Sequence, residues 1–183
     1  SLSFINCTDK GLKAELNTGI IDLAFLLTDS VRHKDVNVTL LRTEDLVLAA
    51  HPDHPLSGGG AFDIKALDGE ILLLAHTDCR YRKPFESLLE ESGVKVHLLE
   101  FCSTLAIRIH LMRGFGITIC PRIAIQEQLQ TSSLVTLPLI TDYLETAVIM
   151  IWHAEKWCSP NLRLFMEIAE EEFKSRNDSP QHS

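Results

Sequence analysis

The sequence of 183 residues is long enough for one large domain or two small α/β lobes, and its 45% hydrophobic content favours a packed core. Its formal net charge of −8 argues against a surface that itself binds nucleic acid, because such surfaces need clustered lysine and arginine. No apolar run approaches the roughly 20 residues that span a bilayer, and the first residues lack the features of a signal peptide.

The cysteines indicate a reducing compartment. Five are present, an odd number, and no two have the Cys-x-x-Cys spacing of a metal or redox motif. We therefore expect a cytoplasmic protein without structural disulfides. The five are Cys7, Cys79, Cys102, Cys120 and Cys158.

The N-terminal part predicts a strand, a helix and a second strand. Residues 2–7 have the apolar content of a strand, Thr8 is a candidate N-cap, and Gly19 ends the helix. Residues 20–27 form a nearly continuous apolar run, as expected for a parallel strand that is covered on both faces.

Strands and helices alternate through the rest of the chain. Further strands are expected at residues 37–41, 45–50, 71–75, 95–99, 117–120, 134–137 and 147–152. Helices are expected at residues 64–67 and 83–92, from Ser103 to Gly114, after Pro121, and from Ser159-Pro160 onward. In the helix after Ser103, we expect Leu105, Ile109 and Met112 to form the inner face. The alternation predicts an α/β protein with mostly parallel sheets.

Six segments resemble sequence landmarks of one protein family. They are Leu16-Asn-Thr-Gly-Ile-Ile-Asp-Leu-Ala-Phe25, residues 46–56, Cys79-Arg-Tyr-Arg82 with Phe85-Glu86, residues 100–103, Gly114-Phe-Gly-Ile-Thr-Ile-Cys-Pro121, and Ser159-Pro160. In this order they resemble the effector-binding domain of LysR-type transcriptional regulators.

The resemblance implies a two-lobed, type 2 periplasmic-binding-protein-like fold with an effector cleft between the lobes. Lobe I would comprise residues 1–43 and 147–183, and lobe II residues 44–146. Residues 2–7 match the second strand of the family domain, so the helix-turn-helix and the first strand and helix of lobe I are expected to be missing. The polar residues 176–183 are expected to form a disordered tail.

The resemblance also implies a function. The chain would bind a polar or charged small molecule and thereby control DNA binding and transcription by the full-length regulator. It would not be an enzyme, would need no cofactor or metal, and would not bind a membrane. DNA would be contacted only through the missing helix-turn-helix, and the full-length protein would form a homodimer or tetramer.

A loop between an expected strand and an expected helix, residues 77–82, is the first candidate for the ligand site. Ligands of open α/β sheets bind at such junctions, and Arg80 or Arg82 beside a helix start would favour an anion. In the family, effector contacts fall at the positions of Cys79 to Tyr81. The alternative is an ordinary surface loop whose arginines pair with carboxylates.

Two more junctions carry hydroxyl groups. Ser103 or Thr104 would cap the following helix and would also be placed to contact a ligand. Thr8 and Asp9 repeat the arrangement in lobe I, although Asp9 would repel an anion. Phe115 would line the cleft or simply pack. The predicted ligand-binding residues are Thr8, Asp9, Thr77, Asp78, Cys79, Arg80, Tyr81, Ser103, Thr104 and Phe115.

Two other functions remain open at this stage. A free-standing solute-binding protein of the same fold would need an export signal upstream of this sequence. An enzyme would need Cys79 as a nucleophile, yet His76 is the only histidine close to it in sequence. His51 and His54 flank a Pro-Asp turn without the further ligands that a zinc site requires.

Overall fold

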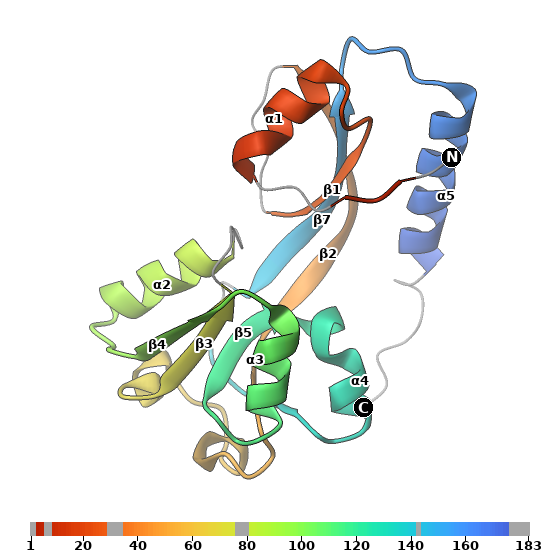
Figure 1. Ribbon diagram of the computed structural model, residues 1–183. Coiled ribbons are helices and arrows are strands. Elements are labelled where there is room, and N and C mark those ends of the chain that lie inside the picture. The colour runs from red at the N-terminus through yellow and green to blue at the C-terminus, as the bar shows by residue number, and fades with distance from the viewer. Residues whose placement is uncertain (1–2, 6–8, 29–34, 76–80, 142–143, 176–183) are drawn as a thin grey trace. The chain divides into compact units, whose positions relative to one another are not determined.

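The computed structural model describes residues 3–5, 9–28, 35–75, 81–141 and 144–175. The chain divides into two compact units: unit 1 is Ser1–Thr43 with Ala147–Ser183, and unit 2 is Glu44–Thr146. Both boundaries fall inside strands, β2 (Val36–Ala50) and β7 (Glu145–His153), which carry the chain from one unit into the other (Figure 1). No helix in the described ranges is long and apolar enough to cross a membrane.

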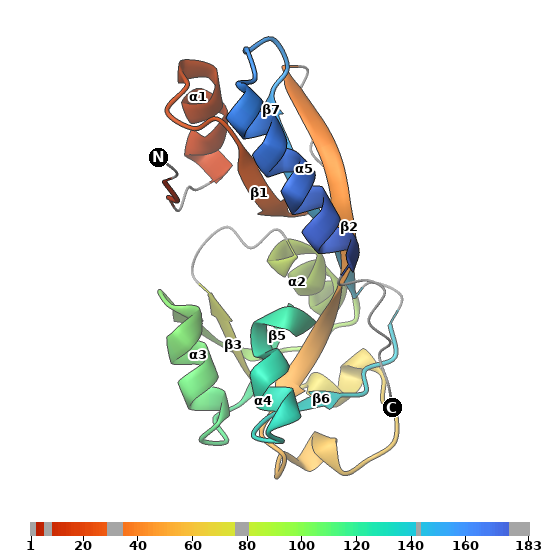
Figure 2. The ribbon, with the colours of Figure 1, turned by 90° about the vertical axis from the view of Figure 1, so that its right-hand side faces the viewer.

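Unit 1 places a helix on each side of a small sheet. Its strand order is β1-β7-β2, with β1 (Ala24–Leu27) antiparallel to β7. Helix α1 (Asp9–Thr18) and helix α5 (Pro160–Ser175) lie on opposite sides of these strands (Figures 1 and 2).

The side chains of β7 explain this arrangement, because successive residues of a strand point to opposite faces. Ile149 and Ile151 pack in one cluster with Leu12 and Leu16 of α1. The intervening Met150 is buried in another cluster, against which side chains of α5 pack. Gly19 ends α1 with a φ of 77°, as the sequence predicts.

Unit 2 is built on the strand order β2-β5-β3-β4, and β6 also pairs with β2. Its other strands are β3 (Ile71–Ala75), β4 (His97–Phe101), β5 (Ile117–Pro121) and β6 (Val135–Leu137). Its α-helices are α2 (Arg82–Glu91), α3 (Thr104–Leu111) and α4 (Gln126–Gln130). Short 3-10 helices are η1 (Pro55–Ser57), η2 (Ile64–Leu67) and η3 (Arg122–Ile125).

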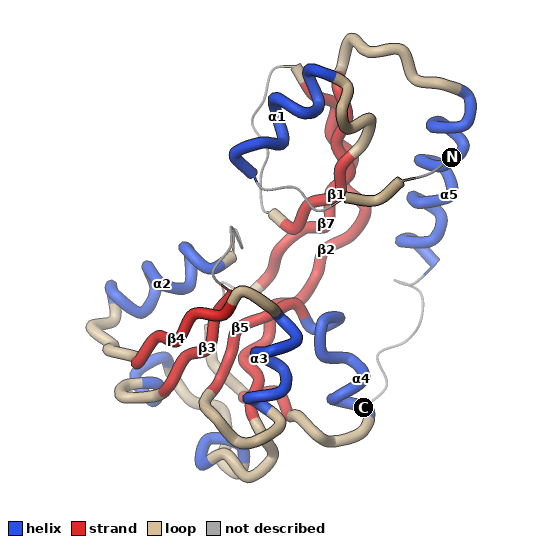
Figure 3. Tube along the Cα trace, in the orientation of Figure 1, coloured by secondary structure: helices blue, strands red, loops and turns tan. Residues whose placement is uncertain are grey.

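The helices of unit 2 cover both faces of its sheet. Leu72 and Leu74 of β3 are buried in the same cluster as Phe85 of α2. Leu73, which points the other way, is buried with Ile107 of α3 in a second cluster. Figure 3 shows the strands between α2 on one side and α3 and α4 on the other.

The α/β class is confirmed, and the sheet is mixed. β3 pairs in parallel with β4 and β5, as expected for strands joined by helices. The expectation of mostly parallel pairing does not hold for β1 with β7 or for β2 with β5 and β6, which are antiparallel. β7 returns to unit 1 in the direction opposite to β2, which alternation along the sequence does not reveal.

Three of the expected strands do not appear as separate strands in the structure. The described residues 3–5 form no strand, although residues 2–7 were expected to, and residues 37–41 and 45–50 belong to one long strand, β2. The polar residues 42–44, which separate the two expected segments, do not interrupt β2. Residues 176–183 lie outside the described residues.

Candidate functional site

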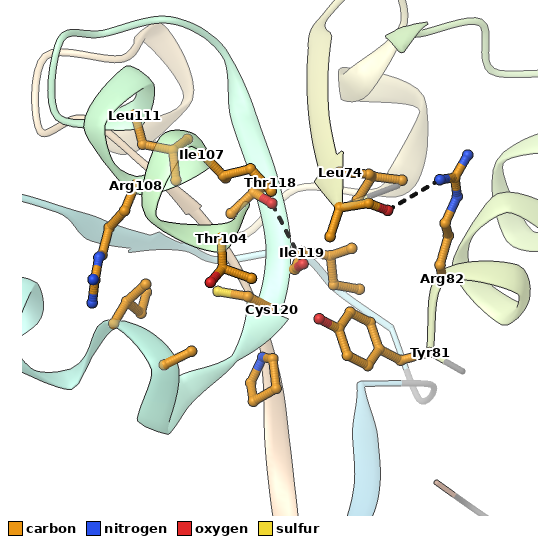
Figure 4. A pocket seen from close by; sticks show the side chains of 14 residues that line it. Leu74, Tyr81, Arg82, Thr104, Ile107, Arg108, Leu111, Thr118, Ile119 and Cys120 are labelled. Carbon is orange, nitrogen blue, oxygen red and sulfur yellow. Dashed lines mark hydrogen bonds between the residues drawn. The ribbon is translucent and has the colours of Figure 1, made fainter. Parts of the chain in front are cut away.

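A pocket lies within unit 2, where β3 and β5 approach the starts of α2 and α3 (Figure 4). Because β3, β4 and β5 run in parallel, their carboxyl ends meet at one edge of the sheet, where open α/β sheets bind ligands. The pocket has a volume of about 120 Å³. For comparison, an apolar cavity of roughly 150 Å³ accommodates benzene.

Most of the pocket wall is hydrocarbon. Its apolar lining comes from the end of β3, from α3, from β5 and from η3. These residues are Leu74, Ala75, Ile107, Leu111, Ile119, Pro121, Ala124 and Ile125. Such a lining favours the transfer of an apolar group from water.

A few polar side chains interrupt this wall: Tyr81, Thr104, Thr118 and Cys120. The buried Thr118 hydroxyl already donates to the Leu73 carbonyl oxygen at 2.6 Å, so its role is to hold β5 to β3. Thr104 is exposed at the start of α3, and its hydroxyl makes no hydrogen bond to any residue that the structure describes. Figure 4 shows Thr104 and Cys120 among the side chains that line the pocket.

Burial raises the pKa of the Cys120 thiol from 9.0 to about 12. The thiol is therefore neutral near pH 7, where it is a weak hydrogen-bond donor and a poor nucleophile. Among the described residues, no group of three histidine, cysteine or acidic side chains is arranged to hold a metal ion.

Arg82 is at the edge of the pocket, but its charge is already paired. Its Nε donates to Glu86 at 2.7 Å, one Nη donates to Glu100, and the other Nη donates to the Ala75 carbonyl oxygen at 3.2 Å. Burial lowers the pKa of Arg82, but the hydrogen bonds and charges of Glu86 and Glu100 outweigh that effect and raise it above its ordinary value. Arg82 thus fixes the start of α2 to the ends of β3 and β4.

Arg108 also lines the pocket, from the middle of α3. Unlike Arg82, it forms no ion pair with a carboxylate in the described part of the chain, and α3 itself contains no acidic residue. Figure 4 shows Arg108 extending along one side of the pocket, with Tyr81 on the opposite side.

The pocket unites two of the predicted ligand-binding residues, Tyr81 and Thr104. Ser103 is the N-cap residue of α3, next to Thr104 but not on the pocket wall. Phe115 is 56% exposed and packs edge-on against the ring of His110, with 6.1 Å between the ring centroids. Asp9 is the first residue of α1 in unit 1. The predicted residues Thr8, Thr77, Asp78, Cys79 and Arg80 lie outside the described residues.

The expected capping of α3 is wrong. Ser103 has no side-chain hydrogen bond to the helix, and only its carbonyl oxygen accepts from the Ile107 N–H, at 3.3 Å. The hydroxyls of Ser103 and Thr104 are therefore not occupied by capping.

Sequence reasoning did not identify Arg108 or the apolar wall from α3 and η3. A usable signal was present, since Thr104 and Arg108 are four residues apart and so lie on one face of the helix. That face could not be assigned to a pocket without knowing which strands it packs against.

Three comparisons with known proteins agree on the family. A family model described as LysR substrate binding domain matches residues 2–174. YwqM of Bacillus subtilis (strain 168), described as an uncharacterized HTH-type transcriptional regulator, is 30% identical over 162 residues, which are 88% of this chain and 55% of that protein. The chain therefore spans about half the length of this relative.

Solved structures show the same fold. The regulatory domain of Synechocystis PCC6803 CcmR, in complex with 2-PG, matches with a TM-score of 0.79 at 22% identity, over 91% of this chain and 80% of that chain. The effector binding domain of QuiR, in complex with shikimate, matches with a TM-score of 0.75 at 19% identity. The match covers 94% of this chain and 81% of that chain.

Proposed function

This chain belongs to the LysR substrate-binding domain family, and from that premise we propose that it is the effector-sensing part of a bacterial transcriptional regulator. Its fold is the two-lobed, type 2 periplasmic-binding-protein-like fold of that family. The observation that carries the proposal is the pocket in unit 2, where Tyr81 and Thr104 interrupt an apolar wall at the carboxyl ends of parallel strands.

In this proposal the domain binds and does not catalyse. The pocket offers neutral hydrogen-bonding groups and two arginines, of which Arg82 is paired, and the high pKa of its Cys120 thiol disfavours nucleophilic catalysis. The small molecule shifts the conformational equilibrium only if it binds one conformation better than another. The hydroxyl of Thr104, which lies on the pocket wall and caps no helix, is available to contact it.

The longer protein would carry out the remaining steps. YwqM is described as an HTH-type regulator, and this chain corresponds to about half of it. We propose that DNA binding resides in the other half, that the full protein is a homo-oligomer, and that it acts in the cytoplasm, where bacterial DNA lies. The chain's own net charge of −8 is consistent with a sensing part that does not itself touch DNA.

A thermal-shift screen tests the sensing role directly. The chain would be melted with amino acids, aliphatic and aromatic carboxylic acids, neutral aromatic compounds, sugars and simple anions, each at several concentrations. A ligand at a hundred times its dissociation constant stabilises the folded state by about 2.7 kcal/mol, which for a chain of this size raises Tm by roughly 5–10 °C. A cooperative melt that no compound class shifts would contradict the proposal.

A further inference from the structure

We propose that the unit 2 pocket selects an apolar carboxylate, whose compact hydrocarbon group, up to about one ring in size, fills the pocket while its carboxylate pairs with Arg108. This inference rests on the proposed effector-sensing function and names the chemical class of the ligand. The cation in this inference is Arg108, which is not among the ligand-binding residues predicted from the sequence.

The hydrocarbon part follows from the wall and the volume of the pocket. Ile107 and Leu111 of α3 and Ile125 of η3 line it from one cluster of buried side chains. Ile119 of β5, which is buried in the cluster on the α2 face of the sheet, lines it as well. The volume of about 120 Å³ is somewhat below the roughly 150 Å³ that accommodates benzene, so branched aliphatic groups and single rings are the largest groups expected to fit. A fused ring system would require the walls to move.

The carboxylate follows from the different environments of the two arginines at the pocket. Arg82 already holds Glu86 and Glu100, so a ligand anion would have to compete with two built-in carboxylates. Arg108 is half-buried beside the hydrocarbon wall and has no carboxylate partner among the described residues. A carboxylate that reaches Arg108 would therefore form a charge-assisted pair without displacing an existing one.

Thr104 supports the same assignment. It lies one helical turn before Arg108, and both line the pocket, so a carboxylate that one of them binds is within reach of the other. Its hydroxyl would donate to the carboxylate oxygen that Arg108 leaves open. The Cys120 thiol, which also lines the pocket, is neutral and does not repel an anion.

The test uses a matched set of probes on the unaltered chain, with affinities measured by isothermal titration calorimetry at pH 7. Benzoate and cyclohexanecarboxylate carry both features, benzamide and cyclohexanecarboxamide lack the charge, and acetate lacks the hydrocarbon group. We expect both ring carboxylates to bind at least tenfold more tightly than the amides and acetate. If the amides or acetate bind as tightly, or if neither ring carboxylate binds, the inference fails.

Two substitutions locate the contacts. Arg108→Gln should weaken benzoate binding at least tenfold and leave benzamide binding unchanged. Arg113→Gln, which alters an exposed arginine just beyond α3, should change neither affinity.

Ala124→Phe, on the exposed side of η3, should fill the pocket and weaken the binding of all ring compounds. Ala66→Phe in η2 is its control and should leave that binding unchanged. Melting curves of each variant check its folding, and the probe comparison does not depend on any variant.

The outcomes separate this inference from the function on which it rests. If the ring carboxylates do not bind but another class raises Tm in the screen, the sensing role stands and the ligand class is wrong. If Arg108→Gln leaves benzoate binding unchanged, the carboxylate does not pair with Arg108 and the inference is overturned. If no compound class stabilises a cooperatively folded chain, both are contradicted.

Discussion

Cys102 and Cys120 come from neighbouring regions of unit 2 but have different environments. Cys102 directly follows β4 and is exposed, whereas Cys120 is part of β5 and lines the pocket. Apolar surroundings raise the pKa of Cys120 to about 12, because a thiolate there would lose its hydration. Since alkylation and oxidation proceed through the thiolate, the two cysteines should differ in reactivity.

We predict that iodoacetamide at pH 8 modifies Cys102 long before Cys120 in the folded chain. A thiol with a pKa of about 12 is ionised at pH 8 to only about one part in ten thousand. Mass spectrometry of peptides after timed alkylation measures both sites, and unfolding in guanidinium should remove the difference. Equal rates in the folded chain would show that Cys120 is not held in an apolar environment.

At the residue scale, the sequence located two residues of the pocket wall but did not distinguish the roles of the arginines beside them. Tyr81 and Thr104 lie on the pocket wall because strand ends and helix starts can be located from sequence patterns. Arg82 and Arg108 could not be distinguished in this way. Whether an arginine is paired depends on carboxylates such as Glu100, which the fold brings to Arg82 from β4.

At the element scale, α3 shows why the position of a helix is easier to predict than its buried face. The predicted inner face of Leu105, Ile109 and Met112 is wrong, because all three are exposed while Ile107 and Leu111 are buried. The helix, Thr-Leu-Ala-Ile-Arg-Ile-His-Leu, has apolar residues on most of its sides, so periodicity does not define one face. The strands and helices beneath it decide which side packs.

The turn between α3 and β5 contains two glycines in the left-handed region, and they differ in their surroundings. Gly114 has a φ of 79° and open space where a Cβ would stand. Gly116 has a φ of 71°, and a Cβ there would collide with the carbonyl oxygen of Ile71, at the start of β3. Only the second glycine is required by both its conformation and its packing.

We therefore predict unequal costs for the two alanine substitutions. Gly114→Ala should destabilise the fold by about 1–2 kcal/mol, from backbone strain alone. Gly116→Ala should cost about 3 kcal/mol or more, because β3 and β5 must also move apart. Urea unfolding of both variants and the parent chain gives the two values. Equal losses would mean that the close approach of Gly116 to β3 does not restrict the turn.

At the scale of the whole molecule, local patterns and long-range pairing differ in how far they could be predicted. The sequence locates β3 without error and most other elements to within a few residues, because apolar runs, glycines and prolines mark them locally. It does not predict that β2 and β5 are antiparallel, since that depends on segments about seventy residues apart. The pocket depends on the same long-range arrangement of β3, β5 and α3.

The family relationship adds what the local patterns lack, namely a reason to interpret the pocket as a sensing site. The family match covers residues 2–174, and the fold agrees with regulatory domains that were solved with 2-PG and with shikimate bound. The identity of the ligand depends on this chain's own residues. Arg82 is paired with two carboxylates, whereas Arg108 has no carboxylate partner within the described ranges, and this difference is the distinguishing feature.

The central claim is that a small molecule binds in the unit 2 pocket, and amide chemical-shift mapping tests it most directly. The ¹⁵N-labelled chain would be titrated with the compound that raises Tm most in the screen. The account predicts that the largest shifts fall on α3, β5 and η3, with Thr104 and Arg108 among them. Saturable binding with its largest shifts around η1 and η2, and none on α3, would contradict it.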